Sequence, residues 1–395
     1  MRDRHAFVSG RWDGNLAVVN LDAALTAGRH AGAIVSRPRV TSGAGDTAPP
    51  GLPVAVVSAP VLGRVAVINH TGNASRAEVG TLPHGHAGTV AVLDCARAID
   101  PAGDGRADAL IGTIPVGPGP VGAVLLPDGR HMLVSSSEGD GTEDGGRILS
   151  LIDIATCTHV TDFTLAHGGA PSAAPSPHES FGNYPNPCGI AFTPAHGGIV
   201  LVANGGSADV SVIPLANIIA RKPMPESGRV GIICGGFGIA MDNEGRQAAV
   251  CNREDPRTGE NGSAITLIDV RAARDNPETA RLADIAVGGP HSRPTGAAFS
   301  PCGTKLYVSC ADSGTVSLVD VADRRESVRK HLDLDQAIPM PRGIAATGDG
   351  RHVVVAGGKK GVPGSSSLWI LDAGSLEILA RVPGVGNESY FLSML

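Results

Sequence analysis

Aromatic residues and long apolar runs are both scarce in this chain. Phe, Trp and Tyr make up 3% of the 395 residues, although 42% of all residues are hydrophobic. A core must therefore be built mainly from Val, Ile, Leu and Ala. No stretch approaches the roughly 18 apolar residues that cross a bilayer, and the charged N-terminal segment lacks the apolar region of a secretory signal. We therefore expect no membrane partner.

Basic runs and paired cysteine motifs are absent as well. The net charge is −6, whereas nucleic acids are bound by positively charged surfaces, so no nucleic-acid partner is expected. The seven cysteines are odd in number, show no CxxC spacing and lie partly in apolar, strand-like phrases. This pattern is typical of reduced, buried thiols and favours a cytoplasmic location. The cysteines occupy positions 95, 157, 188, 234, 251, 302 and 310.

What the chain does contain is one short apolar phrase in seven copies. Each copy alternates apolar side chains with the strand period of two and then ends at a polar turn. The residues that end the apolar part are 51 to 74 positions apart, and the 54 Gly and 29 Pro fall mostly between the copies. A strand repeat of this length predicts an all-β, seven-bladed β-propeller. The copies are LAVVNLD (16–22), VAVLDCA (90–96), LSLIDIA (149–155), VSVIPLA (210–216), ITLIDVR (265–271), VSLVDVA (316–322) and LWILDAG (368–374).

The phrase is one strand of a four-stranded antiparallel repeat. Upstream lies a pair of strands joined by a tight turn, as in GAAFSPCGTKLYVSC (296–310), and downstream lies a fourth strand, as in LADIAVGG (282–289). We expect a single propeller domain over residues 1–395. Blades 2 to 7 are predicted at 52–117, 120–167, 187–234, 237–289, 293–336 and 341–384.

Blade 1 lacks a first strand of its own. Nothing upstream of AFVSG (6–10) has strand composition, whereas ESYFLSML (388–395) does and follows the last blade. We expect blade 1 to consist of residues 5–50 plus 388–395, so that pairing between the two ends of the chain closes the ring. Closure removes the open strand edges that promote aggregation.

The repeated letters resemble those of a known family. GIAFTPAHG (189–197), LYVS (306–309) and VSLVDV (316–321) are similar to the repeats of YVTN-type, lactonase-like seven-bladed propellers. The resemblance covers nearly the whole chain and implies the fold. It implies hydrolysis of a lactone as the activity, although no catalytic motif of the family can be transferred residue by residue, because the shared letters are strand and turn residues.

Arginines and amides concentrate where strands meet the longer loops of one face, which the resemblance implies to be the ligand face. A guanidinium pairs with carboxylates and phosphates in bidentate fashion, so arginines from several blades indicate an anion site. The alternative is that each arginine pairs with a nearby acid such as Asp13, Glu254 or Glu388. The candidate substrate-binding residues are Arg11, Asn186, Asn204, Arg253, Arg293 and Arg342.

Histidines in the same loops are candidate proton carriers, since imidazole titrates near neutral pH and a carboxylate can orient it. Histidines can equally bind a divalent metal, or be ordinary loop residues. The candidate catalytic residues are His70, Glu138, His178, Tyr184 and His291, and the candidate metal ligands are His70, His84, His86, His178 and His291.

Together these features predict an enzyme acting on a small anionic, carboxylate-bearing metabolite at the mouth of the central channel. The expected chemistry is lactone hydrolysis, or a lyase or isomerase step using the same acid–base groups. No G-x-S-x-G elbow or phosphate-binding loop is present, so we expect no organic cofactor, and a divalent metal stays open. The alternative is a non-catalytic propeller that binds a protein or peptide through apolar anchors on its loop face.

Overall fold

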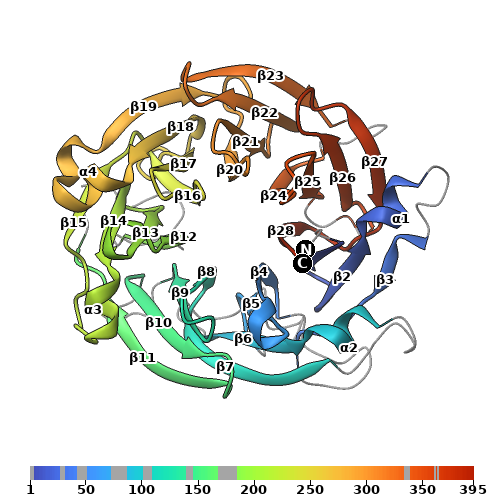
Figure 1. The fold of residues 1–395 in the computed structure, drawn as a ribbon, viewed down its shortest axis with the longest axis horizontal. Coiled ribbons are helices and arrows are strands. Elements are labelled where there is room, and N and C mark those ends of the chain that lie inside the picture. Colours follow the sequence, from blue (N-terminus) through green and yellow to red (C-terminus); the bar gives the residue numbers. More distant parts are fainter. Residues whose placement is uncertain are drawn as a thin grey trace.

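A computed structural model describes residues 4–26, 32–41, 51–72, 87–100, 109–138, 146–167, 185–332, 339–359, 362 and 364–395. The described residues form seven four-stranded antiparallel sheets arranged in a ring (Figure 1), as the strand repeat predicts. Every sheet is a blade whose first strand lines the central channel and whose last strand lies at the rim. Among the described helices, none combines the length and apolar character needed to span a membrane.

The strands fall within or close to the predicted blade ranges. From the channel outward, blade 1 is β28 (Ser389–Met394), β1 (His5–Gly10), β2 (Asn15–Asn20) and β3 (Ile34–Ser36). Blade 2 is β4 (Pro53–Ala59), β5 (Arg64–Asn69), β6 (Ala87–Asp94) and β7 (Leu110–Pro118). Blade 3 is β8 (Pro120–Leu125), β9 (His131–Ser136), β10 (Ile148–Asp153) and β11 (Thr158–Thr164).

The remaining four blades follow the same order. Blade 4 is β12 (Pro187–Thr193), β13 (Ile199–Asn204), β14 (Asp209–Pro214) and β15 (Gly228–Gly231). Blade 5 is β16 (Gly235–Met241), β17 (Gln247–Glu254), β18 (Asn261–Asp269) and β19 (Arg281–Ala286). Blade 6 is β20 (Pro294–Phe299), β21 (Lys305–Cys310), β22 (Thr315–Asp320) and β23 (Arg325–His331). Blade 7 is β24 (Pro341–Ala346), β25 (His352–Gly357), β26 (Ser367–Asp372) and β27 (Ile378–Pro383).

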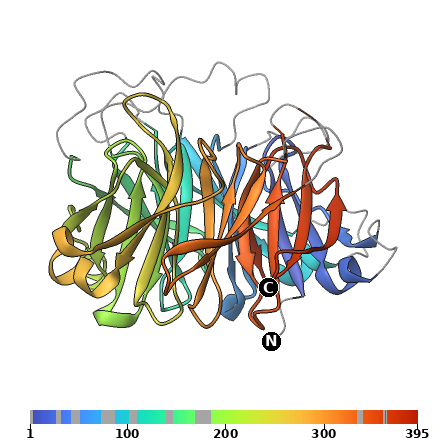
Figure 2. The ribbon, with the colours of Figure 1, turned by 90° about the horizontal axis from the view of Figure 1, so that it is seen from above.

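Strand β28 closes the ring, as predicted for residues 388–395. It pairs antiparallel with β1, with Phe7 opposite Ser393 and Val8 opposite Leu392. Both described ends of the chain therefore lie on the same face of the ring (Figure 2), and β1 runs from that face toward the opposite one. The predicted first strand of blade 1 is confirmed.

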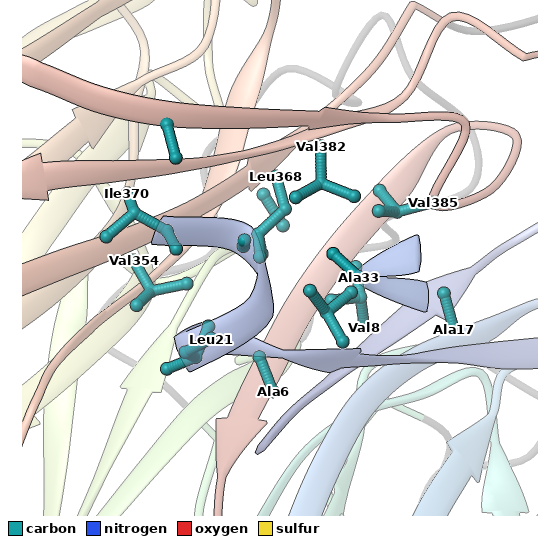
Figure 3. Close-up of a cluster of buried hydrophobic side chains, with 14 residues drawn as sticks. Ala6, Val8, Ala17, Leu21, Ala33, Val354, Leu368, Ile370, Val382 and Val385 are labelled. Atoms are coloured by element: carbon teal, nitrogen blue, oxygen red, sulfur yellow. The ribbon is translucent and has the colours of Figure 1, made fainter. Parts of the chain in front are cut away.

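Seven clusters of buried side chains hold the ring together, one between each pair of neighbouring blades. The cluster between blades 7 and 1 packs Val8 and Leu21 against Ile370 and Val382 (Figure 3). Its members are aliphatic, as the scarcity of aromatic residues predicts. Apolar burial contributes about 25 cal/mol per Å², so these contacts between blades stabilise the closed ring.

The polar turn predicted after each repeated phrase is wrong for four of the seven blades. Short helices follow there: α1 (Leu21–Leu25), α2 (Cys95–Ile99), α3 (Leu215–Ile219) and α4 (Val270–Asp275). The side chains of Asn20, Asp94 and Asp269 each cap a helix by accepting the backbone N–H three residues on. An Asp at the same position in blade 3, Asp153, accepts backbone N–H groups of a turn instead. Ala, Arg and Leu after the cap favour the helix, whereas Thr and Gly do not.

Candidate active site at the channel mouth

Each inner strand carries one extra residue relative to its partner strand near its start. In β8 the register passes from Pro120 opposite Ser136 to Gly122 opposite Ser135, so Val121 has no partner, and the other six blades show the same bulge. A bulge redirects a side chain and is common near active sites. The bulge residues are Val54, Val121, Cys188, Phe237, Thr295, Arg342 and Tyr390.

Glycine follows the bulge residue in five blades and sets the spacing of the inner strands. A Cβ at Gly189 would collide with the carbonyl oxygen of Phe237, and one at Gly343 with that of Tyr390. The bulge residue of the next blade therefore needs glycine beside it to approach this closely. In blade 1 this position is Phe391. The centroid of its aromatic ring lies 5.9 Å from that of Phe237 in blade 5. Phe391 thus forms an apolar floor beneath the bulge residues.

All seven bulge residues line a cavity of about 410 Å³ at the mouth of the channel. Residues at the ends of the second strands or just after them form a further part of its wall, among them Arg11, His70 and Arg253. The residues two positions before the bulge adopt left-handed backbone conformations in six blades. Because Leu52 and Asn186 share that conformation without lining the cavity, it belongs to the repeat and not to the site. The other lining residues are Ser137, Glu138, Arg293, Ala311, Met340 and Glu388.

Two of the four predicted arginines are neutralised by carboxylates. Arg293 lies 3.3 Å from Glu254 and 3.7 Å from Asp312. Arg342 lies 3.4 Å from Glu388 and donates to the Gly358 carbonyl at 2.8 Å. For these two arginines the structure favours the alternative of local ion pairs.

The other two, Arg11 and Arg253, form no ion pair with a carboxylate among the described residues. Each guanidinium lies over an aromatic ring, Arg253 at 4.1 Å from the Phe237 centroid and Arg11 at 4.9 Å from that of Tyr390. Each also has a buried Nε without a hydrogen-bond partner. Burial, followed by the charge of Arg293, lowers the pKa of Arg253. A bound anion would compensate both effects.

Glu388 holds Arg342 in position at the cavity. Its side chain is 3% exposed, and one oxygen faces Arg342 while the other accepts from the indole N–H of Trp12 at 2.6 Å. Arg342 in turn lies over the ring of Tyr390 at 4.6 Å. A buried ion pair with additional hydrogen bonds holds its groups in one geometry. Residues from blade 7 and from both ends of the chain thus meet at one wall.

His70 and Glu138 form an acid–base pair on the opposite side of the cavity. Nε2 of His70 lies 2.9 Å from Oε1 of Glu138, and Nδ1 lies 3.2 Å from the carbonyl oxygen of Pro120. A carbonyl only accepts, so Nδ1 carries a hydrogen, and the bond to Glu138 then contains one further proton, on the imidazole or on the carboxyl. Both side chains stay partly open to the cavity. The pair can therefore take up or release a proton there.

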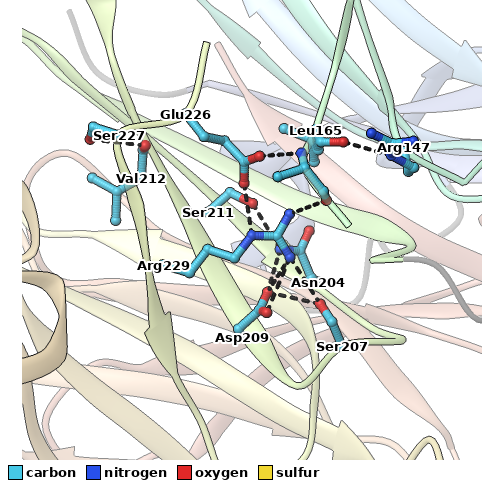
Figure 4. A network of polar contacts seen from close by, with 11 residues as sticks. Arg147, Leu165, Asn204, Ser207, Asp209, Ser211, Val212, Glu226, Ser227 and Arg229 are labelled. Atoms are coloured by element: carbon cyan, nitrogen blue, oxygen red, sulfur yellow. Dashed lines mark hydrogen bonds and ion pairs between the residues drawn. The ribbon is translucent and has the colours of Figure 1, made fainter. Parts of the chain in front are cut away.

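Three predicted site residues within the described part lie outside the cavity lining. Asn204 is buried and donates to Asp209 and Ser211 in a network that Arg229 completes (Figure 4). Asn186 is buried and donates to the carbonyl of Ser137. His291 is exposed at a turn before β20. Both amides therefore hold neighbouring parts of the chain in place. His291 does not line the cavity that the remaining described candidates share.

Four further candidates, His84, His86, His178 and Tyr184, lie outside the described residues. Within the described ranges, no group of three or more His, Cys, Asp or Glu side chains is arranged to hold a metal ion. His70 and His291, the two candidate ligands that are described, do not share a site. The metal hypothesis therefore stays a prediction.

Several lining residues were not selected from the sequence, notably Tyr390, Phe237 and Thr295. The sequence does contain a pattern that identifies such residues. Four inner strands begin with Pro-x-Gly, as in Pro294-Thr295-Gly296, and the central residue of each lines the cavity. Aligning the remaining blades on this pattern would have placed Phe237 and Tyr390 at the same level.

Solved structures match over nearly the whole chain. A periplasmic gluconolactonase of Pseudomonas aeruginosa is 16% identical, with a TM-score of 0.66, over 99% of this chain and 98% of that one. A candidate 6-phosphogluconolactonase of Bacteroides uniformis is 14% identical, with a TM-score of 0.65, over 100% of both chains. One from Bacteroides fragilis is 11% identical, with a TM-score of 0.63, over 99% and 98%. The chain shares the fold of these propellers.

These matches confirm the predicted resemblance to lactonase-like seven-bladed propellers, and at such low identities they establish the fold alone. A hydrazine synthase of Kuenenia stuttgartiensis matches with a TM-score of 0.47 over 65% of this chain and 63% of that one, and supports no conclusion. No family model and no curated protein matches the sequence. Function must therefore be argued from the cavity.

Proposed function

We propose that this protein is a lactone hydrolase that acts on a small carboxylate- or phosphate-bearing substrate in the cavity at the channel mouth. The observation that carries the proposal is the division of that cavity. Uncompensated guanidiniums of Arg11 and Arg253 lie on one side, and the proton-holding pair of His70 and Glu138 lies on the other. A volume of about 410 Å³ suits a small molecule.

The lining is positively charged although the whole protein is not. Four arginines face the cavity, the pair of His70 and Glu138 is neutral as a whole because it holds one further proton, and Glu388 is negative, so the lining carries a charge of +3. The whole chain carries −6. Since field lines concentrate in a recessed site, an anionic substrate is drawn toward this mouth. The anionic group would bind Arg11 and Arg253, which have no internal partner to give up.

Hydrolysis then requires one proton acceptor and one donor. Water adds to the lactone carbonyl carbon, the bond from that carbon to the ring oxygen breaks, and the products are a carboxylate and an alcohol. Glu138, oriented by His70, would accept the proton of the attacking water. Bringing water and carbonyl together in a fixed geometry supplies a further part of the acceleration.

The proposal is tested with 6-phosphogluconolactone, which carries the anionic group, and with gluconolactone as its uncharged counterpart, following proton release by the purified protein. We expect Glu138→Gln to lower kcat by about 10²- to 10⁴-fold with an unchanged melting temperature, because the side chain is 28% exposed and Gln keeps its size and shape. Arg271→Ala, on the exposed outer face of α4, is the matched control and should act as the wild type. Full turnover by Glu138→Gln would exclude this carboxylate as the base.

A lyase or isomerase step could use the same pair, and product analysis distinguishes it because hydrolysis incorporates oxygen from water. The peptide-binding alternative finds less support. Such a face would have to use the aromatic residues near the loops. Trp12 is half-buried and donates to Glu388, while Tyr390 and Phe391 lie inside the channel mouth. A peptide-binding face needs such anchors exposed.

A further inference from the structure

The proposed hydrolysis leaves one chemical role unassigned. When the bond from the carbonyl carbon to the ring oxygen breaks, that oxygen must gain a proton to leave as an alcohol. His70 and Glu138 are occupied by the proton of the attacking water. A second group that faces the same cavity is required, and it lies on the side where the arginines are.

We propose that Tyr390 is the general acid of this cavity and donates its phenolic proton to the leaving ring oxygen. Tyr390 lines the cavity from the bulge of β28. Its hydroxyl forms no hydrogen bond with a described residue and is not among the fully enclosed polar atoms. This inference rests on the proposed function, and it concerns a residue that the sequence assigned only to the closing strand.

The surroundings of Tyr390 differ from those of a core tyrosine. Tyr307 is 1% exposed, donates to the carbonyl of Ala373 at 2.9 Å, and burial raises its pKa to about 12. Tyr390 is 8% exposed and has no such acceptor. Two guanidiniums lie over its ring, that of Arg342 at 4.6 Å and that of Arg11 at 4.9 Å from the centroid.

The charges around the phenol favour proton donation. Burial alone raises the pKa of Tyr390, but Arg11, Arg342 and Arg253 together lower it more, against an opposing contribution from Glu388, and the net direction is down. An ordinary phenol is a weak acid at neutral pH. Cations beside the ring stabilise the phenolate that remains after donation, so the proton transfer becomes easier.

The proton balance closes over one turnover. Tyr390 gives its proton to the ring oxygen, which leaves as an alcohol, while Glu138 holds the proton of the water. The newly formed carboxylic acid loses its own proton to solvent, and the phenolate recovers one from Glu138 through water. No oxidant or further reactant is needed, and the arginines stay protonated throughout.

Two measurements on Tyr390→Phe test this role. The variant keeps the ring that packs against both guanidiniums and removes only the hydroxyl. We expect kcat to fall by about 10²- to 10⁴-fold with little change in KM. The protonated phenol is the active form, so wild-type activity should fall as pH rises through the pKa of Tyr390. This fall is the basic limb of the pH–rate profile, and it should be missing from the profile of Tyr390→Phe. Tyr307→Phe, outside the cavity, is the matched control and should keep both the wild-type kcat and the basic limb of the pH–rate profile.

The second measurement does not depend on turnover. Phenolate absorbance is followed during a pH titration of the wild type, of Tyr390→Phe and of Tyr307→Phe, with and without gluconate. The wild type should show a phenol that titrates below the ordinary range and is missing only in Tyr390→Phe. Gluconate should raise its pKa, because a bound anion offsets the arginines that stabilise the phenolate.

The outcomes separate this inference from the proposed function. If the wild type hydrolyses lactones and Tyr390→Phe keeps its rate and basic limb, Tyr390 is not the acid and the function stands. If the wild type hydrolyses neither lactone, the proposed function fails, and a low-titrating phenol that responds to gluconate still supports Tyr390 as the proton-carrying group of an anion site. A phenol titration that gluconate leaves unmoved overturns the inference in either case.

Discussion

The two sides of the cavity are built from the same repeat and yet differ in chemistry. On the arginine side, blades 5, 6, 7 and 1 contribute Arg253, Arg293, Arg342 and Arg11. On the histidine side, blades 2 to 4 contribute the bulge residues Val54, Val121 and Cys188, with His70 and Glu138 above them. The inner-strand bulge recurs on both sides, so the choice of side chains gives one side its arginines and the other its acid–base pair.

The arginine side is also assembled from residues that are farther apart in the sequence. Glu388 and Tyr390 come from the end of the chain, Arg11 from its beginning and Arg342 from blade 7. The bulge residues of the histidine side come from consecutive blades and contact their immediate neighbours. Substitutions at the pair of Arg342 and Glu388 should therefore alter stability and activity together, whereas substitutions at the bulge residues of the histidine side should alter both only slightly.

Deleting residues 388–395 should have the largest effect, because it removes the inner strand of blade 1 and, with it, Glu388 and Tyr390. The interfaces of blade 1 with its neighbours would open and the strand edge of β1 would be exposed. We expect loss of cooperative thermal unfolding and of anion binding together. An unchanged melting temperature would show that the ring does not need β28 for closure.

Glu388→Gln should come next. The substitution leaves the buried guanidinium of Arg342 without its counter-ion, which costs about 3–5 kcal/mol, as measured by denaturant unfolding. Asp323→Asn is the control, because its partner Arg325 is exposed and such surface pairs contribute about 1 kcal/mol or less. Equal effects of the two substitutions would mean that the buried pair does not organise the arginine side.

Arg253→Met should weaken activity while sparing stability. Losing charge-assisted hydrogen bonds to the substrate should reduce kcat/KM by about 100-fold. The folded protein should be as stable or more stable, since an uncompensated, half-buried cation is removed. Arg293→Met provides the contrast, because it removes the ion pairs with Glu254 and Asp312 and should lower the melting temperature. A destabilised Arg253→Met would indicate that Arg253 has a structural role instead.

Cys188→Ala, on the histidine side, should have the smallest effect. Removing one buried sulfur costs about 1 kcal/mol, and activity should stay within about threefold of the wild type, since burial raises the pKa of this thiol to about 12 and keeps it unreactive.

Alkylation provides a comparison within the same molecule. Hydrogen bonds from Ser300 and Thr304 lower the pKa of the exposed Cys302 to about 7. Mass spectrometry after brief labelling at neutral pH should find Cys302 modified and Cys188 unmodified. Rapid labelling of Cys188 would contradict its enclosure.

The number of blades and the ring closure could be predicted because both follow from period-two alternation, a property of neighbouring residues. The set of cavity arginines was predicted as well, from their place at strand ends. Which of them form ion pairs could not be predicted, since Arg342 meets Glu388 from another blade while Arg11 lies over the ring of Tyr390. Asn204 was misplaced because a strand-end amide can turn outward to Asp209 as readily as inward. Such choices depend on distances between blades, which local patterns do not contain.

The hydrogen bond from Ser9 to the carbonyl oxygen of Phe391 joins residues 382 positions apart. On the ribosome, β1 therefore waits with an unpaired edge until the other blades have been synthesised. Pairings between such distant residues form slowly, and the waiting edge is where a nascent chain would associate with a neighbour. Cells that make this protein should need to protect that edge during translation, and substrate-binding ability should arise only in the last moments of folding.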